Sequence, residues 1–161
     1  MRPGAVLVRT ARREDYDALI ALFDELDEFH RHARPDFFRC FAGPARSREQ
    51  IEKWLDGPGS TLLVAEVDEA VVGLAVLLKR PPASFAGAVP RKVIELDTLM
   101  VGARHRSRHV GHALLMAVVE WSRGQGASHV EVGVHAFNRD ARRFYERFGF
   151  GASIDRLVIA A

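Results

Sequence analysis

Cysteine is almost absent from this sequence, and long hydrophobic runs are missing altogether. The 161 residues include one cysteine, Cys40, so no disulfide can form within the chain, as is usual in a reducing cytoplasm. Residues 1–11 hold no apolar segment of the export-signal kind, and nowhere do about 18 apolar residues follow one another. The sequence therefore predicts neither export nor membrane insertion, and it favours a cytoplasmic protein.

An excess of charge of one sign is also missing. The formal net charge is +2, from 23 basic and 21 acidic residues, and this balance does not by itself indicate a nucleic-acid partner. Internal repeats and low-complexity segments are absent as well. The length and the 48% hydrophobic content fit one globular domain over residues 1–161.

Apolar periodicity divides the chain into strands and helices. Strands are predicted at residues 6–11, 61–67, 70–79, 93–101, 129–137 and 155–160. Helices are predicted at residues 13–30, 47–55, 114–122 and 139–148, the third ended by Gly124 or Gly126. Ser47 and Gln50 form a capping box, and Asn138 caps the last helix. This order predicts an α/β fold with a largely antiparallel first half and a parallel crossover around the central helix.

A cationic loop leads directly into the central helix. Three arginines and two histidines lie between Arg104 and His109, shortly before Gly111. A helix N-terminus has free N–H groups and a positive dipole end, so this loop suits a multiply charged phosphate. A solvated basic turn and a nucleic-acid-reading helix are the alternatives. The helix is too apolar from Leu114 to Val119 to read a groove, and the glycine at the junction favours the phosphate.

The stretch LDTLMV-GARH-RSRHVG-HALL, followed by VGVHAFNRDARRFYERFGF, resembles the GNAT superfamily of acyl-coenzyme A-dependent N-acyltransferases. In that family a loop of the form [Arg/Gln]-x-x-Gly-x-[Gly/Ala] wraps the pyrophosphate of coenzyme A. Arg106 to Gly111 matches its first and last positions, while His109 replaces its first glycine. The resemblance covers nearly the whole chain and implies a mixed sheet, splayed at the cofactor site and flanked by helices. It implies coenzyme A contacts at Leu99, Met100, Val101, Arg106, Ser107, Arg108, His109, Val110, Gly111, His112 and Asn138.

Two acids precede the loop on the same predicted strand. Period-two alternation places Glu95, Asp97, Leu99 and Val101 on one face. Transfer to an amine needs a neutral nucleophile, and a carboxylate acting through water can supply it. The resemblance favours Glu95, eleven residues before Arg106, as the base and Asp97 as the partner of the substrate amine, and the reverse assignment stays open. The alternative for each acid is a hydrogen-bonded or solvent-facing carboxylate.

Tyr145 carries the remaining catalytic expectation. It lies beside Phe144 on the apolar stripe of the last helix, which favours a core aromatic residue when the pattern is taken alone. The resemblance implies a second role, as the donor that protonates the departing thiolate.

The histidines raise the question of a metal. His30 with His32, or His105 with its neighbours, lack accompanying cysteine or carboxylate ligands, so no metal is expected. His30, Phe37 and Phe38 are expected either at the lip of the acceptor pocket or in helix-end packing. The loop at residues 81–91 is expected to line the same entrance.

These expectations describe an N-acetyltransferase that transfers acetyl from acetyl-CoA to a primary amine within a ternary complex. A non-catalytic acyl-CoA-binding or regulatory module on the same fold is the alternative. The acceptor stays open among a small polyamine, an aminoglycoside, an amino acid and a protein amine. Neither nucleic acid nor membrane is expected as a partner, whereas a homodimer is kept as a candidate.

Overall fold

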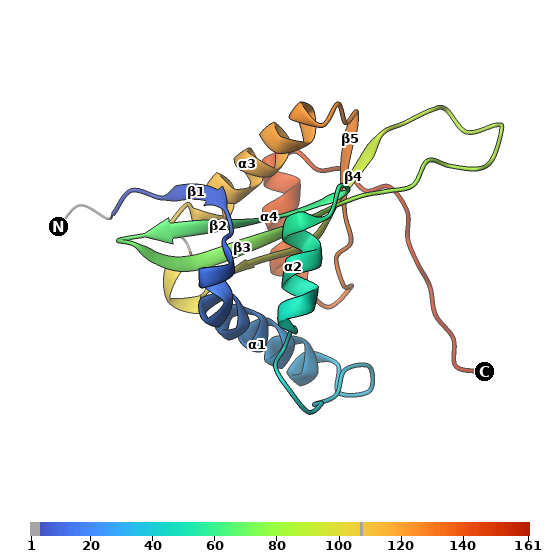
Figure 1. The fold of residues 1–161 in the computed structure, drawn as a ribbon. Coiled ribbons are helices and arrows are strands. Elements are labelled where there is room, and N and C mark those ends of the chain that lie inside the picture. Colours follow the sequence, from blue (N-terminus) through green and yellow to red (C-terminus); the bar gives the residue numbers. More distant parts are fainter. Residues whose placement is uncertain (1–3, 107) are drawn as a thin grey trace.

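The computed structural model describes residues 4–106 and 108–161, which form one mixed sheet with helices on both faces (Figure 1). The strands are β1 (Leu7–Thr10), β2 (Ser60–Val67), β3 (Ala70–Lys79), β4 (Val93–Val101) and β5 (His129–Val132). The helices are α1 (Tyr16–Ala33), α2 (Arg48–Asp56), α3 (Val110–Gly124) and α4 (Arg139–Phe148), with short 3₁₀ turns η1 (Arg13–Asp15) and η2 (Ala103–His105). The strand order is β1-β2-β3-β4-β5, antiparallel through β4 and parallel between β4 and β5. The predicted α/β class and the crossover around α3 are confirmed.

The sheet separates two apolar cores. One lies under α3 and α4 and contains Leu114, Leu115 and Val118, all fully buried. The other lies under α1 and α2 and contains Leu19 and Phe23, also fully buried. The sequences of β2 and β3, which are covered on both faces, are nearly continuous apolar runs.

Local signals fix most element boundaries. The β2–β3 hairpin turns through Asp68 and Glu69 with φ of 49° and 65°, as a tight two-residue turn requires. Both predicted N-caps are confirmed: the Gln50 N–H donates to Ser47 Oγ at 3.1 Å, and the Ala141 N–H donates to the Asn138 side chain at 3.1 Å. The return hydrogen bond that would complete the capping box at Ser47 is not among the contacts of the described residues. Among the described residues no helix combines the length and apolar character needed to cross a membrane.

A bulge in β4 corrects the predicted alternation. Val76 lies opposite Thr98 while Leu77 lies opposite Leu96, so Asp97 is an extra residue without a partner on β3. Ile94 and Leu96 pack under α3 before the bulge, and after it Leu99 and Val101 pack there. Met100 turns to the α1 side. The expectation that Glu95, Asp97, Leu99 and Val101 share a face is therefore wrong: Leu99 and Val101 face away from Glu95.

β4 and β5 separate at the bulge. Their pairing covers Val93 to Leu96, whereas β4 stays paired with β3 as far as Val101. Along the described residues, the β4 edge from Asp97 to Val101 that faces β5 has no strand partner. This is the splay that the resemblance implied.

Two predicted strands differ from the structure. The strand expected at residues 129–137 ends at Val132, because the chain beyond it diverges from β4. The strand expected at residues 155–160 is wrong, since that segment is extended and exposed without forming a strand. A strand requires a partner for its N–H and C=O groups, and the tail after α4 runs outward from the sheet (Figure 1).

Candidate active site

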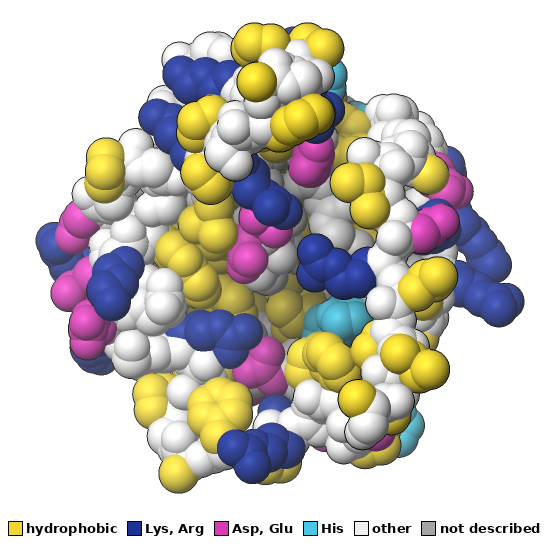
Figure 2. Space-filling model, turned by 90° about the vertical axis from the view of Figure 1, so that its right-hand side faces the viewer, with side chains coloured by type: hydrophobic (Ala, Val, Ile, Leu, Met, Phe, Trp, Pro, Cys, Tyr) yellow, Lys and Arg dark blue, Asp and Glu magenta, His cyan; other side chains and the backbone are white. Residues whose placement is uncertain are grey.

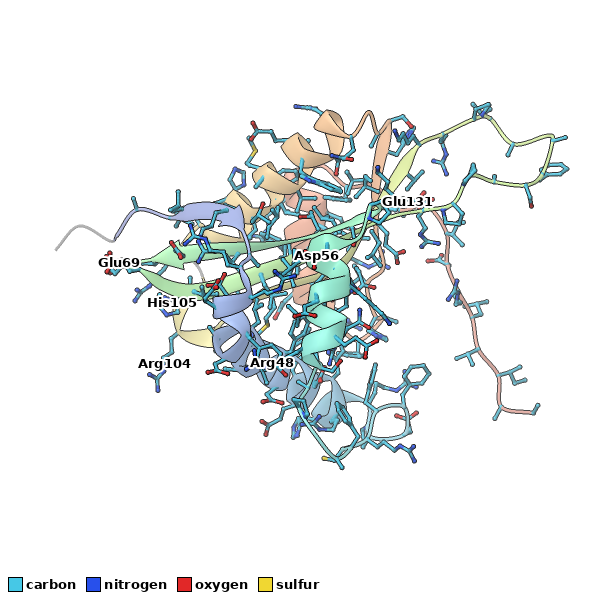
Figure 3. All side chains as sticks on the ribbon, viewed as in Figure 1. Arg48, Asp56, Glu69, Arg104, His105 and Glu131 are labelled. Atoms are coloured by element: carbon cyan, nitrogen blue, oxygen red, sulfur yellow. The ribbon has the colours of Figure 1, made fainter. Side chains whose placement is uncertain are left out.

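The cationic loop connects the free end of β4 to the N-terminus of α3. Arg106 and Arg108 are exposed on it, and Arg104 points away from the body of the protein (Figure 3). Ser107, one of the expected coenzyme A contacts, lies outside the described residues. The first helical residue, Val110, is buried, so the helix N-terminus is anchored in the core. The N–H groups of this first turn, which lack partners within the helix, lie where the loop joins α3.

Helix α1 holds this loop from the other side. Glu25 accepts a hydrogen bond from the Ala103 N–H at 2.8 Å and pairs with the Arg106 guanidinium at 3.7 Å. Arg106 Nε donates to the Val101 carbonyl at 3.2 Å. The expected phosphate ligand, Arg106, is thus drawn back toward the strand end and α1.

His109 has a backbone conformation that explains the glycine expected in its place. It is the N-cap of α3 with φ of 61° and ψ of 9°, in the left-handed region that favours glycine. Its side chain is exposed and makes no capping hydrogen bond. The position therefore calls for a positive φ, and histidine occupies it at a cost in backbone energy.

Gly111 is constrained by a neighbouring helix. A Cβ atom at this position would lie 2.9 Å from Phe144 Cζ on α4, closer than normal packing permits. From the sequence, we interpreted this glycine as leaving room for a ligand to approach the backbone. In the structure the missing side chain leaves room for the Phe144 ring, which joins α3 to α4.

The two expected acids differ in their surroundings. Glu95 is half-buried and forms an ion pair with Arg80 at 2.8 Å, at the end of the β3–β4 connection. Asp97, the bulged residue, is exposed and accepts a hydrogen bond from Thr98 Oγ1 at 3.0 Å. Asp97 is therefore the more accessible carboxylate, while Glu95 has a cationic neighbour, Arg80, that the sequence pattern did not reveal.

Tyr145 lies in the core under α3 and α4, with 8% of its surface exposed. Its ring contacts Phe144 and Phe150, with centroids 5.4 and 5.5 Å away. Burial raises the pKa of the Tyr145 hydroxyl to about 12, so the group is protonated at neutral pH. Leu99 and Val101 pack against the same core. Tyr145 thus lies on the face of the sheet toward which the strand end after the bulge turns.

An aromatic cluster forms where α1 ends. His30 and Phe38 lie with ring centroids 5.2 Å apart, and Phe37 lies 5.1 Å from Phe38, so the structure brings the three expected residues together. His135 and Phe137 join them, with His135 5.2 Å from His30. Sequence reasoning missed these last two because it placed them inside a strand; their signal was the aromatic pair just before the Asn138 cap.

The electrostatics of the cluster favour neutral imidazole at His135. Partial burial lowers the pKa of His135, and the neighbouring His30 and Arg34 lower it further. Within residues 4–106 and 108–161, no group of three or more histidine, cysteine or acidic side chains is arranged to hold a metal ion.

The connection at residues 80–92 projects outward rather than folding over the sheet (Figure 1). Phe85 and Val89 on it are 74% and 79% exposed. Its two ends are tied to the sheet, by the Arg80–Glu95 pair and by an Arg91–Glu131 pair at 3.2 Å. Figure 2 views this side of the molecule and shows a hollow with a hydrophobic floor and charged side chains around it.

Comparisons with known proteins agree with this arrangement. The Acetyltransferase (GNAT) family model matches residues 23–150. The chain is 24% identical over 143 residues to the uncharacterized N-acetyltransferase YhfO of Bacillus subtilis, covering 89% of this chain and 88% of that protein. N-acetyltransferase 8B of Rattus norvegicus is 32% identical over 101 residues, covering 62% of this chain and 43% of the relative.

Solved structures share the fold. A tetramutant of the BH1408 protein from Bacillus halodurans superposes with a TM-score of 0.89 at 24% identity, covering 96% of this chain and 99% of that one. The aminoglycoside N-acetyltransferase AAC(6')-Iy, solved with CoA, superposes with a TM-score of 0.71 at 17% identity, covering 99% and 96%. Since the family match spans most of the chain, and the splayed sheet and the strand–loop–helix junction accompany it, the protein belongs to the GNAT family of acetyltransferases.

Proposed function

We propose that the protein transfers an acetyl group from acetyl-CoA to a primary amine by direct transfer in a ternary complex. The observation that carries this proposal is the open edge of β4 between Asp97 and Val101, which leads directly to the N-terminus of α3. An unpaired strand edge offers N–H and C=O groups to an amide-containing chain, and a helix N-terminus offers N–H groups to a phosphate.

Coenzyme A would lie along these two features in turn. The backbone of Leu99, Met100 and Val101 would pair with the pantetheine arm; Met100 contributes backbone only, since its side chain is buried on the α1 side. The pyrophosphate would meet the loop and the first turn of α3, at Arg106, Ser107, Arg108, His109, Val110, Gly111 and His112. Asn138 would contact the cofactor in addition to capping α4.

The acceptor amine must lose a proton before it attacks the thioester carbonyl. For an alkylammonium of pKa near 10.4, deprotonation at pH 7 costs roughly 4.6 kcal/mol. Asp97 would hold the amine because it is the exposed acid, and Glu95 would accept the proton through water. The Arg80–Glu95 ion pair must then loosen or be tolerated during turnover.

The departing sulfur requires a proton in return. When the amine nitrogen forms its bond to the carbonyl carbon, the C–S bond breaks and leaves a thiolate. Tyr145, with a pKa of about 12, is protonated and would donate to it. Full transfer to a thiolate of ordinary pKa near 8.5 would be uphill by roughly 5 kcal/mol, so the hydroxyl would act first as a hydrogen-bond donor as charge develops. A backbone N–H of β4 would stabilise the oxyanion.

The proposal includes no acyl-enzyme, because Cys40 is exposed in the α1–α2 connection and far along the chain from the matched motif. The acceptor would enter past His30, Phe37 and Phe38, whose rings form part of the aromatic cluster. We further propose a cytoplasmic location, consistent with a single free cysteine.

One observation favours a second function. Glu95, the expected base, is already paired with Arg80, as would suit a module that binds acyl-CoA without catalysis.

A thiol-release assay separates the two functions. Acetyl-CoA would be offered with a polyamine, an aminoglycoside, amino acids and a lysine-containing peptide, while calorimetry measures acetyl-CoA affinity. Thiol release with any of the amines supports the enzyme. Binding without release supports the module, and the absence of binding contradicts both.

A further inference from the structure

The aromatic cluster at the end of α1 is open to solvent. Phe29 belongs to it as well, with its ring centroid 5.9 Å from that of Phe137. The cluster lies outside both apolar cores, and Phe29 and Phe37 are 42% and 63% exposed. In Figure 2 a histidine lies against hydrophobic side chains at the border of the hollow. Aromatic rings gathered on a surface in this way mark a binding site.

The cluster is formed before any ligand arrives. His30 Nδ1 lies 2.9 Å from the Leu26 carbonyl, one helical turn earlier, and because a carbonyl only accepts, this nitrogen carries a proton. The hydrogen bond holds the imidazole ring in place. His135 stacks on Phe137 with centroids 5.4 Å apart and 19° between the ring planes. Rings that are already fixed bind a flat group at a low cost in conformational entropy.

The cluster lies next to the splayed end of the sheet. His135 and Phe137 belong to the connection that runs from the end of β5 at Val132 to the cap of α4 at Asn138. The Asn138 N–H donates to the His135 carbonyl at 2.8 Å. Asn138 is one of the expected coenzyme A contacts. An acceptor whose amine reaches the β4 strand end can therefore lay the rest of its body on the cluster.

The charge of this region does not suit a polycation. Residues 29–41 contain three arginines and one acid, Asp36, which is paired with Arg34 at 2.9 Å. The Arg34 guanidinium also lies over the Phe37 ring, 5.5 Å from its centroid. The excess of positive charge repels ammonium groups that enter here.

Neighbouring acids are paired or turned away. Asp27 on α1 and Glu131 on β5 form ion pairs with arginines, at 2.8 and 3.2 Å. Asp24 and Glu28 lie about 120° and 160° around the axis of α1 from His30, because the helix has 3.6 residues per turn. An acceptor with several ammonium groups would leave most of them without a carboxylate.

One carboxylate at the strand end is accessible to an amine. Asp97 in the β4 bulge is exposed, and along residues 4–106 and 108–161 it has no ion-pair partner. Glu95 is already paired with Arg80. A single free acid beside a set of exposed rings matches a molecule with one ammonium and an aromatic body.

We propose that the acceptor is a primary amine with a single positive charge and an aromatic group, which lies on the aromatic cluster while the amine reaches Asp97. This inference rests on the proposed transfer reaction and names its substrate class. The nitrogen bonds to the acetyl carbonyl carbon and the C–S bond breaks. The ammonium gives up two protons, one to solvent and one to the departing sulfur, so the products are the N-acetyl amide and coenzyme A thiol.

Thiol release with matched amines tests the substrate class. The value of kcat/KM for 2-phenylethylamine should exceed that for 2-cyclohexylethylamine, which has the same carbon skeleton and a saturated ring, by about three- to tenfold. It should exceed the values for spermidine, kanamycin and a lysine-containing peptide by about a hundredfold or more. Equal or faster release with any comparison amine overturns this inference and leaves the transfer reaction standing. No release with any amine overturns both.

Two leucine variants test the location. Phe37→Leu removes a ring from the cluster, so KM for 2-phenylethylamine should rise about three- to tenfold while KM for acetyl-CoA stays unchanged. Phe41→Leu is the matched control: Phe41 is 56% exposed on the same connection, and among the described residues its ring contacts no other ring of the cluster. It should leave both constants unchanged. Both variants should keep the wild-type melting temperature, since both side chains are exposed. An unchanged KM in Phe37→Leu, or an equal rise in both variants, would overturn the placement.

Discussion

Replacing His109 with glycine tests the link between backbone strain and cofactor binding at the loop. The residue has φ of 61° and ψ of 9°, a left-handed conformation that costs a non-glycine residue about 1–2 kcal/mol. Relief of this strain is partly offset, because glycine raises the entropy of the unfolded chain and so lowers stability by about 0.5–1 kcal/mol. His109→Gly should therefore stabilise the protein by up to about 1 kcal/mol, which corresponds to roughly 2–4 °C in melting temperature for a domain of this size.

Coenzyme A affinity should hold or rise in the same variant, because glycine keeps the loop in its present path. Calorimetric titration gives the affinity and differential scanning calorimetry gives the melting temperature. Two controls separate the causes. Glu69→Gly relieves an equivalent φ of 65° in the β2–β3 turn and should stabilise without altering affinity. His109→Ala removes the imidazole but keeps the strained conformation, so it should show neither gain.

The reasoning is refuted by a loss of coenzyme A affinity greater than about tenfold in His109→Gly, roughly 1.4 kcal/mol. Such a loss, shared by His109→Ala, would mean that the imidazole contacts a phosphate itself. A fall in melting temperature in His109→Gly, with a rise in Glu69→Gly, would show that backbone strain is not what governs this position.

Three further outcomes are expected. Tyr145→Phe should keep the melting temperature and acetyl-CoA affinity while turnover falls by about 10²- to 10⁴-fold, and normal turnover in the stable variant would leave the residue a core aromatic. Gly111→Val should cost about 1–3 kcal/mol of stability by overlapping the Phe144 ring, as well as weakening coenzyme A binding; unchanged thermal stability and affinity would contradict both. The pKa of His135 is lowered in the folded state, so the unfolded chain binds more protons as pH falls below about 6.5, and stability should decline there. His135→Phe should lessen that decline in urea titrations at pH 7 and pH 5; an equal decline in the variant would place its origin elsewhere.

Local signals made most of the fold predictable. Ser47 and Asn138 cap helices where hydrogen-bonding side chains precede apolar periodicity, and the turn at Asp68 and Glu69 follows from two β-rich runs. The position of the cationic loop between a strand and a helix was equally readable. In each case the determining contacts lie within a few residues, so a short window of sequence contains the cause.

The remaining features depend on contacts between distant segments. The bulge at Asp97 is a property of the β3–β4 register, and simple alternation cannot reveal it. The Arg80–Glu95 pair joins the two ends of a long connection, and His135 reaches His30 only because β5 ends early. The segment at residues 155–160 has a strand-like sequence, but a strand also needs a neighbour, and no strand of residues 4–106 and 108–161 pairs with it.

The contact between Glu25 and the loop acts as a resting position for Arg106. The guanidinium and the carboxylate are 55% and 40% exposed, and an ion pair so open to water contributes about 0–1 kcal/mol. A competing anion would therefore displace Glu25 from the arginine at little energetic cost. The Ala103 N–H donates to the same carboxylate at 2.8 Å, so a second contact that does not involve the arginine also ties the loop to α1. Arg106 is therefore held on the loop by a weak ion pair that a stronger anionic partner would replace.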